Sequence, residues 1–400
     1  MLHYKFFKWA LMGVFFLITP SFSQEFDPIS VPLSPRNANY TMDVKLNPIN
    51  KIMTGSTTLE WINITEYSAP DLRFHLYYNA WRNNKSSFFK SVRYNSFNWS
   101  SYRDNEWAYS DVKSMRITYE DGREVDLTPQ LTFIQPDDGN PDDRTVLQAP
   151  LAEPVESGSK VTVSIEWEAK VPRAFARTGA IGEYYFVAQW FPKIGVFEAN
   201  GTWKSHQFIQ TEFYADYGNY DVSMTVPTGW VVGATGLERA QQENGDGTTT
   251  HRYHQEDVHD FVWTASRYAQ VYTARFEDPS LPPVDMRLLL MPDHIQHKDR
   301  YFEATRAALK YYGTWFGAYP YGHVTVVDPA YQSRSGGMEY PTLFTGGTRW
   351  LSPPETLSPE GVTVHEAGHQ FWYGIIGNDE FEDAWMDEGF NTYSTTRTME

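Results

Sequence analysis

The chain has 400 residues, of which 41% are hydrophobic and 16% aromatic, and its formal net charge is −17. A chain of this length can bury more than one hydrophobic core, which predicts two or three domains. The acidic balance argues against nucleic acids and anionic membrane surfaces as partners, because both are negatively charged. The sequence contains no cysteine, which excludes disulfide bonds and a lipid anchor on cysteine.

The first 23 residues have the pattern of a secretory signal peptide. Lys5 and Lys8 supply a positive start, residues 9–18 an apolar core, and residues 21–23 a small-x-small cleavage site. The apolar core is shorter than the about 20 residues that a membrane-spanning helix needs. We therefore expect an exported, bacterial-type protein, periplasmic or secreted, with no membrane span after the signal is removed.

Residues 24–280 are predicted to form an N-terminal β-domain. Short runs of alternating apolar and polar residues, such as 57–62 and 161–167, recur between Val31 and Phe276. Clusters of Pro, Asp, Asn and Gly separate these runs, which is typical of turns between antiparallel strands. The proline-rich stretch 278–283 is the expected boundary with a second domain over residues 281–400.

The hydrophobic period changes after this boundary. Residues 298–316 have the pattern of an amphipathic helix that ends before Gly317, and residues 323–327 and 338–345 that of strands. Residues 356–376 are predicted to form a second helix, and residues 391–400 lie within a third. The chain as a whole is therefore predicted to have an α+β fold.

His365, Glu366 and His369 form an HExxH box within the second predicted helix. Because a helical turn takes about 3.6 residues, the two histidines lie on one face and can reach one zinc ion. Glu366 then points to the open side of that ion, where it can take a proton from a water molecule. Glu388 can supply a third ligand, because a turn around Gly377 brings back another helix. The apolar flanks indicate a buried helix, where unpartnered His and Glu side chains would be costly.

The chain resembles the M1 family of zinc aminopeptidases, which are gluzincins with a thermolysin-like catalytic domain. The resemblance rests on HEAGHQFWYG at 365–374, on WMDEGF at 385–390, and on GGMEYP at 336–341, which is similar to the family motif GxMEN. Residues 40–64 and 213–236 are similar to strands of the family's N-terminal domain. The resemblance covers residues 38–400.

This resemblance implies a fold and a metal. The fold is a saddle-like N-terminal β-sandwich followed by the first half of a thermolysin-like zinc peptidase domain. The metal is one zinc ion per chain, held by His365, His369 and Glu388, with Glu366 as the general base.

The resemblance also implies peptide substrates that have a free N-terminus. Glu339 would hold the substrate α-amine, together with Gln189 in the run YYFVAQWFP. Gly336 and Gly337 would let a substrate backbone lie close to the edge strand that carries Glu339.

Two features depart from the family pattern. Tyr340 stands where the motif has asparagine, and the family's oxyanion-stabilising tyrosine would lie several dozen residues past Glu388, beyond Glu400. We therefore expect the N-terminal portion of a longer protein, or a truncated reading frame. Two other functions stay open: a gluzincin endopeptidase, which would not need Glu339, and a non-catalytic binding scaffold or inactive fragment that keeps the fold.

Overall fold

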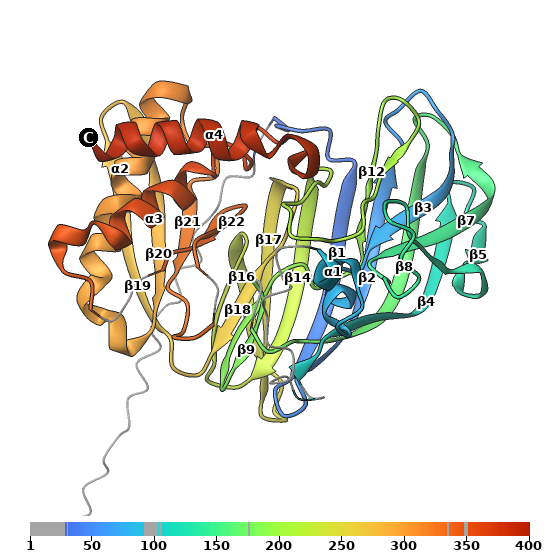
Figure 1. The fold of residues 1–400 in the computed structure, drawn as a ribbon, viewed down its shortest axis with the longest axis horizontal. Coiled ribbons are helices and arrows are strands. Elements are labelled where there is room, and N and C mark those ends of the chain that lie inside the picture. The colour runs from blue at the N-terminus through green and yellow to red at the C-terminus, as the bar shows by residue number, and fades with distance from the viewer. Residues whose placement is uncertain are drawn as a thin grey trace, which may run out of the picture.

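A computed structural model describes residues 29, 31–91, 103, 106–174, 177–333, 336–347 and 351–400. The predicted signal peptide, residues 1–23, lies outside the described residues. Figure 1 shows a strand-rich part beside a part in which three helices accompany a smaller sheet, so the fold is α+β, as expected. Within the described residues, no helix has the length and hydrophobicity that crossing a membrane requires.

The strand-rich part comes first along the chain. It contains β1 (Ala38–Asn47), β2 (Ile52–Ile62), β3 (Ala69–His75), η1 (Tyr77–Trp81), α1 (Ser87–Lys90), β4 (Tyr109–Tyr119), β5 (Glu124–Asp126), η5 (Thr128–Gln130), β6 (Thr132–Ile134), β7 (Val146–Val155), β8 (Lys160–Lys170), β9 (Gly179–Ile181), β10 (Tyr184–Val187), β11 (Lys193–Ile194), β12 (Val196–Phe197), β13 (Trp203–Lys204), β14 (Gly218–Pro227), β15 (Val231–Ala234), β16 (Leu237–Glu243), β17 (Thr248–Val258) and β18 (Trp263–Ser266).

The second part follows. It contains β19 (Gln270–Asp278), β20 (Leu281–Leu290), η6 (Pro292–His297), α2 (Lys298–Phe316), β21 (His323–Val327), β22 (Met338–Tyr340), β23 (Leu343–Thr345), η7 (Pro354–Thr356), α3 (Ser358–Gly368) and α4 (Glu380–Met399). The predicted helix 298–316 and strand 323–327 are confirmed with the same bounds.

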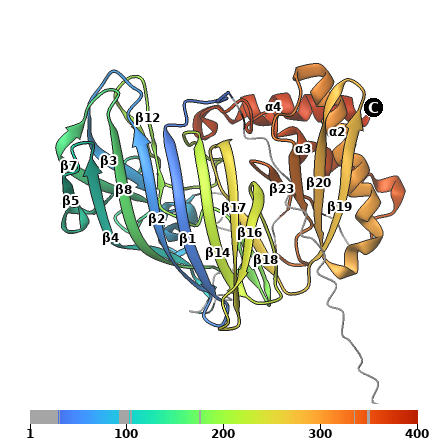
Figure 2. The same ribbon diagram turned by 180° about the vertical axis from the view of Figure 1, so that it is seen from behind.

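An eight-stranded sheet dominates the β-domain, in the order β16-β17-β14-β1-β2-β8-β4-β5, and Figure 2 shows it from behind. Alternate residues of β14 are buried, because successive side chains of a strand point to opposite faces. Large aromatic rings cover the buried face; the centroids of Trp61 and Trp203, for example, lie 5.5 Å apart.

The β-domain was expected to be antiparallel, but it contains a parallel pair of strands. Strand β1 pairs in parallel with β14, with Tyr40 opposite Tyr220. A parallel pair needs a long crossover connection, and the chain between these two strands supplies one. Periodicity within a strand says nothing about the direction of its neighbour, so the sequence pattern could not show this.

The smaller sheet has the order β19-β20-β21-β23-β22. The predicted boundary at residues 280 and 281 falls in the β19–β20 hairpin, whose strands pair within this sheet. The change from one sheet to another lies earlier, between Ser266 and Gln270, and we propose the domain boundary there.

Residues 338–345 form a hairpin rather than the single predicted strand. Pro341 and Thr342 make its turn, and Thr342 has a positive φ of 58°. The Gln370 side chain holds this turn, because its Nε2 donates to Tyr340 O at 2.9 Å and its Oε1 accepts from Thr342 N at 2.8 Å. Strand β22, which carries Glu339, is consequently the edge of the sheet.

The predicted helix 356–376 is shorter in the structure. Helix α3 ends at Gly368, and the chain continues in wider turns in which Gly374 N donates to His369 O at 2.8 Å. Tyr373 has φ of 100°, a left-handed conformation that a continuous helix excludes.

Candidate active site

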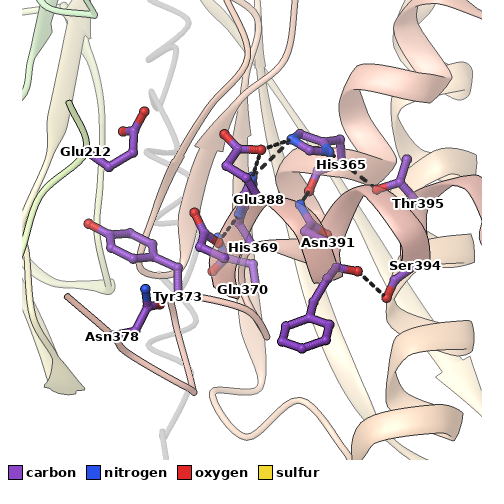
Figure 3. A network of polar contacts seen from close by, with 12 residues as sticks. Glu212, His365, His369, Gln370, Tyr373, Asn378, Glu388, Asn391, Ser394 and Thr395 are labelled. Carbon is purple, nitrogen blue, oxygen red and sulfur yellow. Dashed lines mark hydrogen bonds and ion pairs between the residues drawn. The ribbon is translucent and has the colours of Figure 1, made fainter. Parts of the chain in front are cut away.

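The HExxH box and Glu388 converge at the contact between α3 and α4. The Nε2 atoms of His365 and His369 lie 3.1 Å apart. Glu388 Oε2 lies 3.2 Å from His365 Nε2 and 3.8 Å from His369 Nε2. Figure 3 shows the three side chains meeting; His365 lies on α3, His369 follows its last residue, and Glu388 lies on α4. The structure thus brings the three predicted zinc ligands together.

This donor set suits zinc. Two imidazole nitrogens and one carboxylate oxygen, all within 4.8 Å of one another, match a three-ligand catalytic site that keeps one position open. The site opens on one side, because the His365 and Glu388 side chains are 24% and 46% exposed whereas His369 is 1% exposed.

Asp387 orients the buried histidine. Its carboxylate accepts a hydrogen bond from His369 Nδ1, which leaves Nε2 free to bind a metal. Burial opposes protonation of His369, but the charge of Glu339 and the bond to Asp387 outweigh it and raise the pKa to about 10. The surroundings therefore stabilise positive charge at this point.

Three buried carboxylates, those of Glu339, Glu366 and Asp387, lie near the two histidines. Burial raises the pKa of Glu339 to about 8 and raises the pKa of Glu366 well above its usual range. Burial also raises the pKa of Asp387. Glu366 Oε2 has no hydrogen-bond partner among the described residues. A divalent cation would offset this unfavourable concentration of negative charge, so the residues present fit zinc.

Asn391 ties the two helices together. Its Nδ2 donates to His365 O at 2.7 Å, and its Oδ1 accepts from the Tyr312 hydroxyl at 2.7 Å. The helices approach closely because of Gly368, where an added Cβ would lie 2.0 Å from Asn391 Oδ1. Glu388, which lies on the same helix as Asn391, is thereby held against the HExxH helix.

Glu339 lies beside the metal ligands. A carboxylate oxygen of Glu339 is within 4.8 Å of ligand atoms of Glu366 and His369, and the residue is only 4% exposed. Gly337 allows this approach, because a Cβ there would lie 2.1 Å from Glu366 Oε1. No atom of the described residues lies within 4 Å of a Cβ added at Gly336, so crowding by these residues does not require glycine there.

Gln189 makes a hydrogen bond within the β-domain, and its expected role beside Glu339 stays a prediction. Its Nε2 donates to Asp260 Oδ2 at 2.5 Å, and the other Asp260 oxygen binds Lys193 Nζ at 2.8 Å. This group is buried in the β-domain.

A different β-domain residue, Glu212, faces the metal ligands. Figure 3 shows it opposite Glu388, and its charge acts on Glu339 and Asp387. Arg177 binds the Glu212 carboxylate through two guanidinium nitrogens. Sequence reasoning missed Glu212 although it directly precedes the stretch 213–236 that resembles the family's strands.

Comparison with solved structures supports the fold. The chain is similar to the crystal structure of an M1 zinc metallopeptidase from Deinococcus radiodurans, with a TM-score of 0.58 and 17% identity over 90% of this chain and 70% of that one. A two-domain M1 zinc metallopeptidase mutant bound to L-tryptophan gives a TM-score of 0.58 and 16% identity over 90% and 71%. The Deinococcus mutant bound to a Tyr-Ser-Ala substrate gives 0.56 and 16% over 90% and 71%.

The chain has the fold of these metallopeptidases. Neither a model of a known protein family nor a curated protein sequence matches it. In this chain the candidate zinc ligands His365, His369 and Glu388 lie close to one another, and Glu366 and Glu339 lie close to His369.

Proposed function

We propose that this protein is a zinc-dependent aminopeptidase of the M1 type that releases N-terminal residues from peptides. One observation carries the proposal: the ligand set of His365, His369 and Glu388 lies next to two further buried glutamates, Glu366 and Glu339. The first glutamate suits proton transfer and the second suits recognition of a substrate amine. The similarity in fold to M1 zinc metallopeptidases also supports a zinc-dependent peptidase.

The chemistry divides between the metal and the chain. Zinc held by His365, His369 and Glu388 would act as a Lewis acid toward a water molecule and the scissile carbonyl. Glu366 takes the proton of that water on its Oε2 atom, which has no partner among the described residues. It then passes the proton to the leaving amine, and its raised pKa favours holding the proton between the two steps.

Two carboxylates from opposite sides of the site hold the substrate's ammonium group. Glu339 approaches from the edge strand β22, and Glu212 from the β-domain. A carboxylate and an ammonium form strong charge-assisted hydrogen bonds, which fix the scissile bond one residue from the end of the peptide. An endopeptidase would have no use for these contacts.

Acetylation of the substrate's α-amine tests this specificity. We expect the zinc-loaded protein to cleave a peptide with a free N-terminus and to leave its N-acetylated form intact. E339Q should raise KM for the free peptide about tenfold, since an amide binds ammonium less strongly than a carboxylate does. E183Q, which changes a glutamate in the turn between β9 and β10, is the matched control. Equal cleavage of both peptides would instead identify an endopeptidase.

Metal content separates an enzyme from a binding scaffold. We expect one zinc per chain by elemental analysis, and its loss in H369A. A purified protein that takes up no zinc and cleaves neither peptide would favour the scaffold.

A further inference from the structure

The segment that carries Glu212 is held at both ends by the elements that carry the metal ligands. Residues 205–217 connect β13 to β14 without regular secondary structure. We call residues 204–217 the strap. Its two ends contact the start of α4, which leads to Glu388, and the turn after His369.

The first end of the strap is bound to the start of α4. Lys204 Nζ lies 2.6 Å from Glu382 Oε1 and 3.4 Å from Asp379 Oδ2. The ring of His206 stacks on Phe381, with the centroids 4.0 Å apart and the planes at 5°. Asp379 is also the N-cap of α4, accepting hydrogen bonds from the first backbone N–H groups of the helix. This end therefore attaches to the point where α4 begins.

The second end is bound to the strained turn after α3. The Tyr217 hydroxyl lies 3.1 Å from both Tyr373 O and Gly374 O, and donates its one proton to these carbonyls. His259 Nε2 donates to Tyr373 O from 3.1 Å. A left-handed tyrosine persists only when its surroundings hold it, and here the holding groups come from the β-domain. Gly377 permits the approach, because its Cβ would lie 2.5 Å from the Tyr217 hydroxyl oxygen.

We propose that the strap positions Glu212 for the substrate's ammonium group, and that Tyr217 and Lys204 are its positioning residues. The inference rests on the proposed function and extends it. In the middle of the strap the Glu212 carboxylate pairs with Arg177, which belongs to the β-domain. The two end contacts relate the strap to the turn after His369 and to the start of the helix that carries Glu388. Loosening either end changes substrate binding without changing a metal ligand.

Two variants with matched controls test this proposal. Y217F removes a buried hydroxyl that bonds backbone carbonyls across the strap's second end, and K204M removes the charge at its first end. The control Y185F removes another buried β-domain hydroxyl, which donates to Pro48 O at 2.9 Å. The control K160M removes a lysine that lies 3.5 Å from Glu60 in a pair of β-domain strands. Each variant is measured for zinc affinity by chelator competition, for thermal stability, and for kcat and KM on a free N-terminal peptide.

We expect Y217F and K204M to raise KM about tenfold, to change kcat less than about twofold, and to keep wild-type zinc affinity. E212Q should raise KM to a similar extent, and both controls should keep the wild-type KM. The proposal is overturned if E212Q raises KM while Y217F and K204M do not. It is also overturned if zinc affinity falls in step with KM, because the strap would then serve the metal. Failure of the proposed function shows separately, as equal cleavage of free and acetylated peptides by the wild-type protein.

Discussion

Glu366 shows how the surroundings of one residue select its chemistry. It lies next to His365 in the helix, yet its side chain is buried against Gly337 while His365 reaches the exposed side. Burial and the nearby charge of Glu339 raise its pKa, and its Oε2 has no partner among the described residues. A glutamate in this environment is suited to exchanging a proton, whereas Glu388, with a lowered pKa from its contact with His365, is suited to staying ionised as a ligand.

Substitution of Glu366 tests its proposed role as the group that exchanges the proton. E366Q keeps the shape of the side chain but cannot accept a proton, so kcat should fall by about 10²–10⁴ while one zinc stays bound. E360Q on the same helix is the control, because Glu360 lies outside the candidate ligand set and pairs with Arg300, with Oε2 and Nη2 2.8 Å apart. Elemental analysis and peptide kinetics measure both effects. Loss of zinc in E366Q would contradict the role of general base.

At the scale of elements, the contact between α3 and α4 decides whether the ligand set forms. Gly368 and Asn391 make this contact close, and Tyr312 on α2 completes it through the Asn391 side chain. The Asn391 side chain lies against the backbone of Gly368, so even a methyl group at residue 368 would collide with it.

The second prediction compares two glycines of the same helix. G368A should lower the free energy of unfolding by about 1–3 kcal/mol and weaken zinc binding, because the added Cβ displaces Asn391 from His365 O. G361A should keep stability or raise it by up to about 1 kcal/mol, since a Cβ there meets nothing within 4 Å and alanine favours helix. Urea unfolding and chelator competition measure the pair. Equal effects at both positions would mean that helix propensity, not the α3–α4 contact, controls the site.

At the scale of the whole molecule, the two sheets meet through buried polar contacts. His323 at the start of β21 donates from Nε2 to Gln255 Oε1 on β17 at 2.9 Å. Burial lowers the pKa of His323 to about 3, so it is neutral in the folded protein at moderate pH. The unfolded chain binds a proton there below about pH 6.5. The stability that depends on neutral His323 is therefore present above that pH and is lost as the pH falls toward 3.

The third prediction follows from that linkage. H323Q should be less stable than the wild type at pH 7. At pH 5 the difference in unfolding free energy between the two proteins should be smaller by about 2 kcal/mol, because only the wild type must release a proton from residue 323 when it folds. Urea unfolding of both proteins at the two pH values measures the difference. A deficit independent of pH would show that His323 is not held neutral by burial.

The convergence of the candidate zinc ligands was predictable from sequence, and the position of Glu212 was not. His365, Glu366 and His369 are related by helical spacing, and Glu388 follows within the next helix, so short-range geometry brings them together. Gln189 was expected to share the amine site with Glu339, and the structure shows its Nε2 donating to Asp260. Glu212, which was not expected, lies opposite Glu388. Which β-domain residue reaches the site depends on how a long irregular segment is held, and no local pattern encodes that.

Local periodicity in the sequence by itself determined the α+β class, the bounds of α2 and β21, and the helical spacing of the two histidines, because each depends on residues close together along the chain. Tertiary structure alone decided the parallel pairing of β1 with β14, the hairpin turn held by Gln370, the left-handed Tyr373 and the position of Glu212. These features depend on contacts between residues far apart in sequence, whose free energy is set by the packed molecule and not by the preference of any segment.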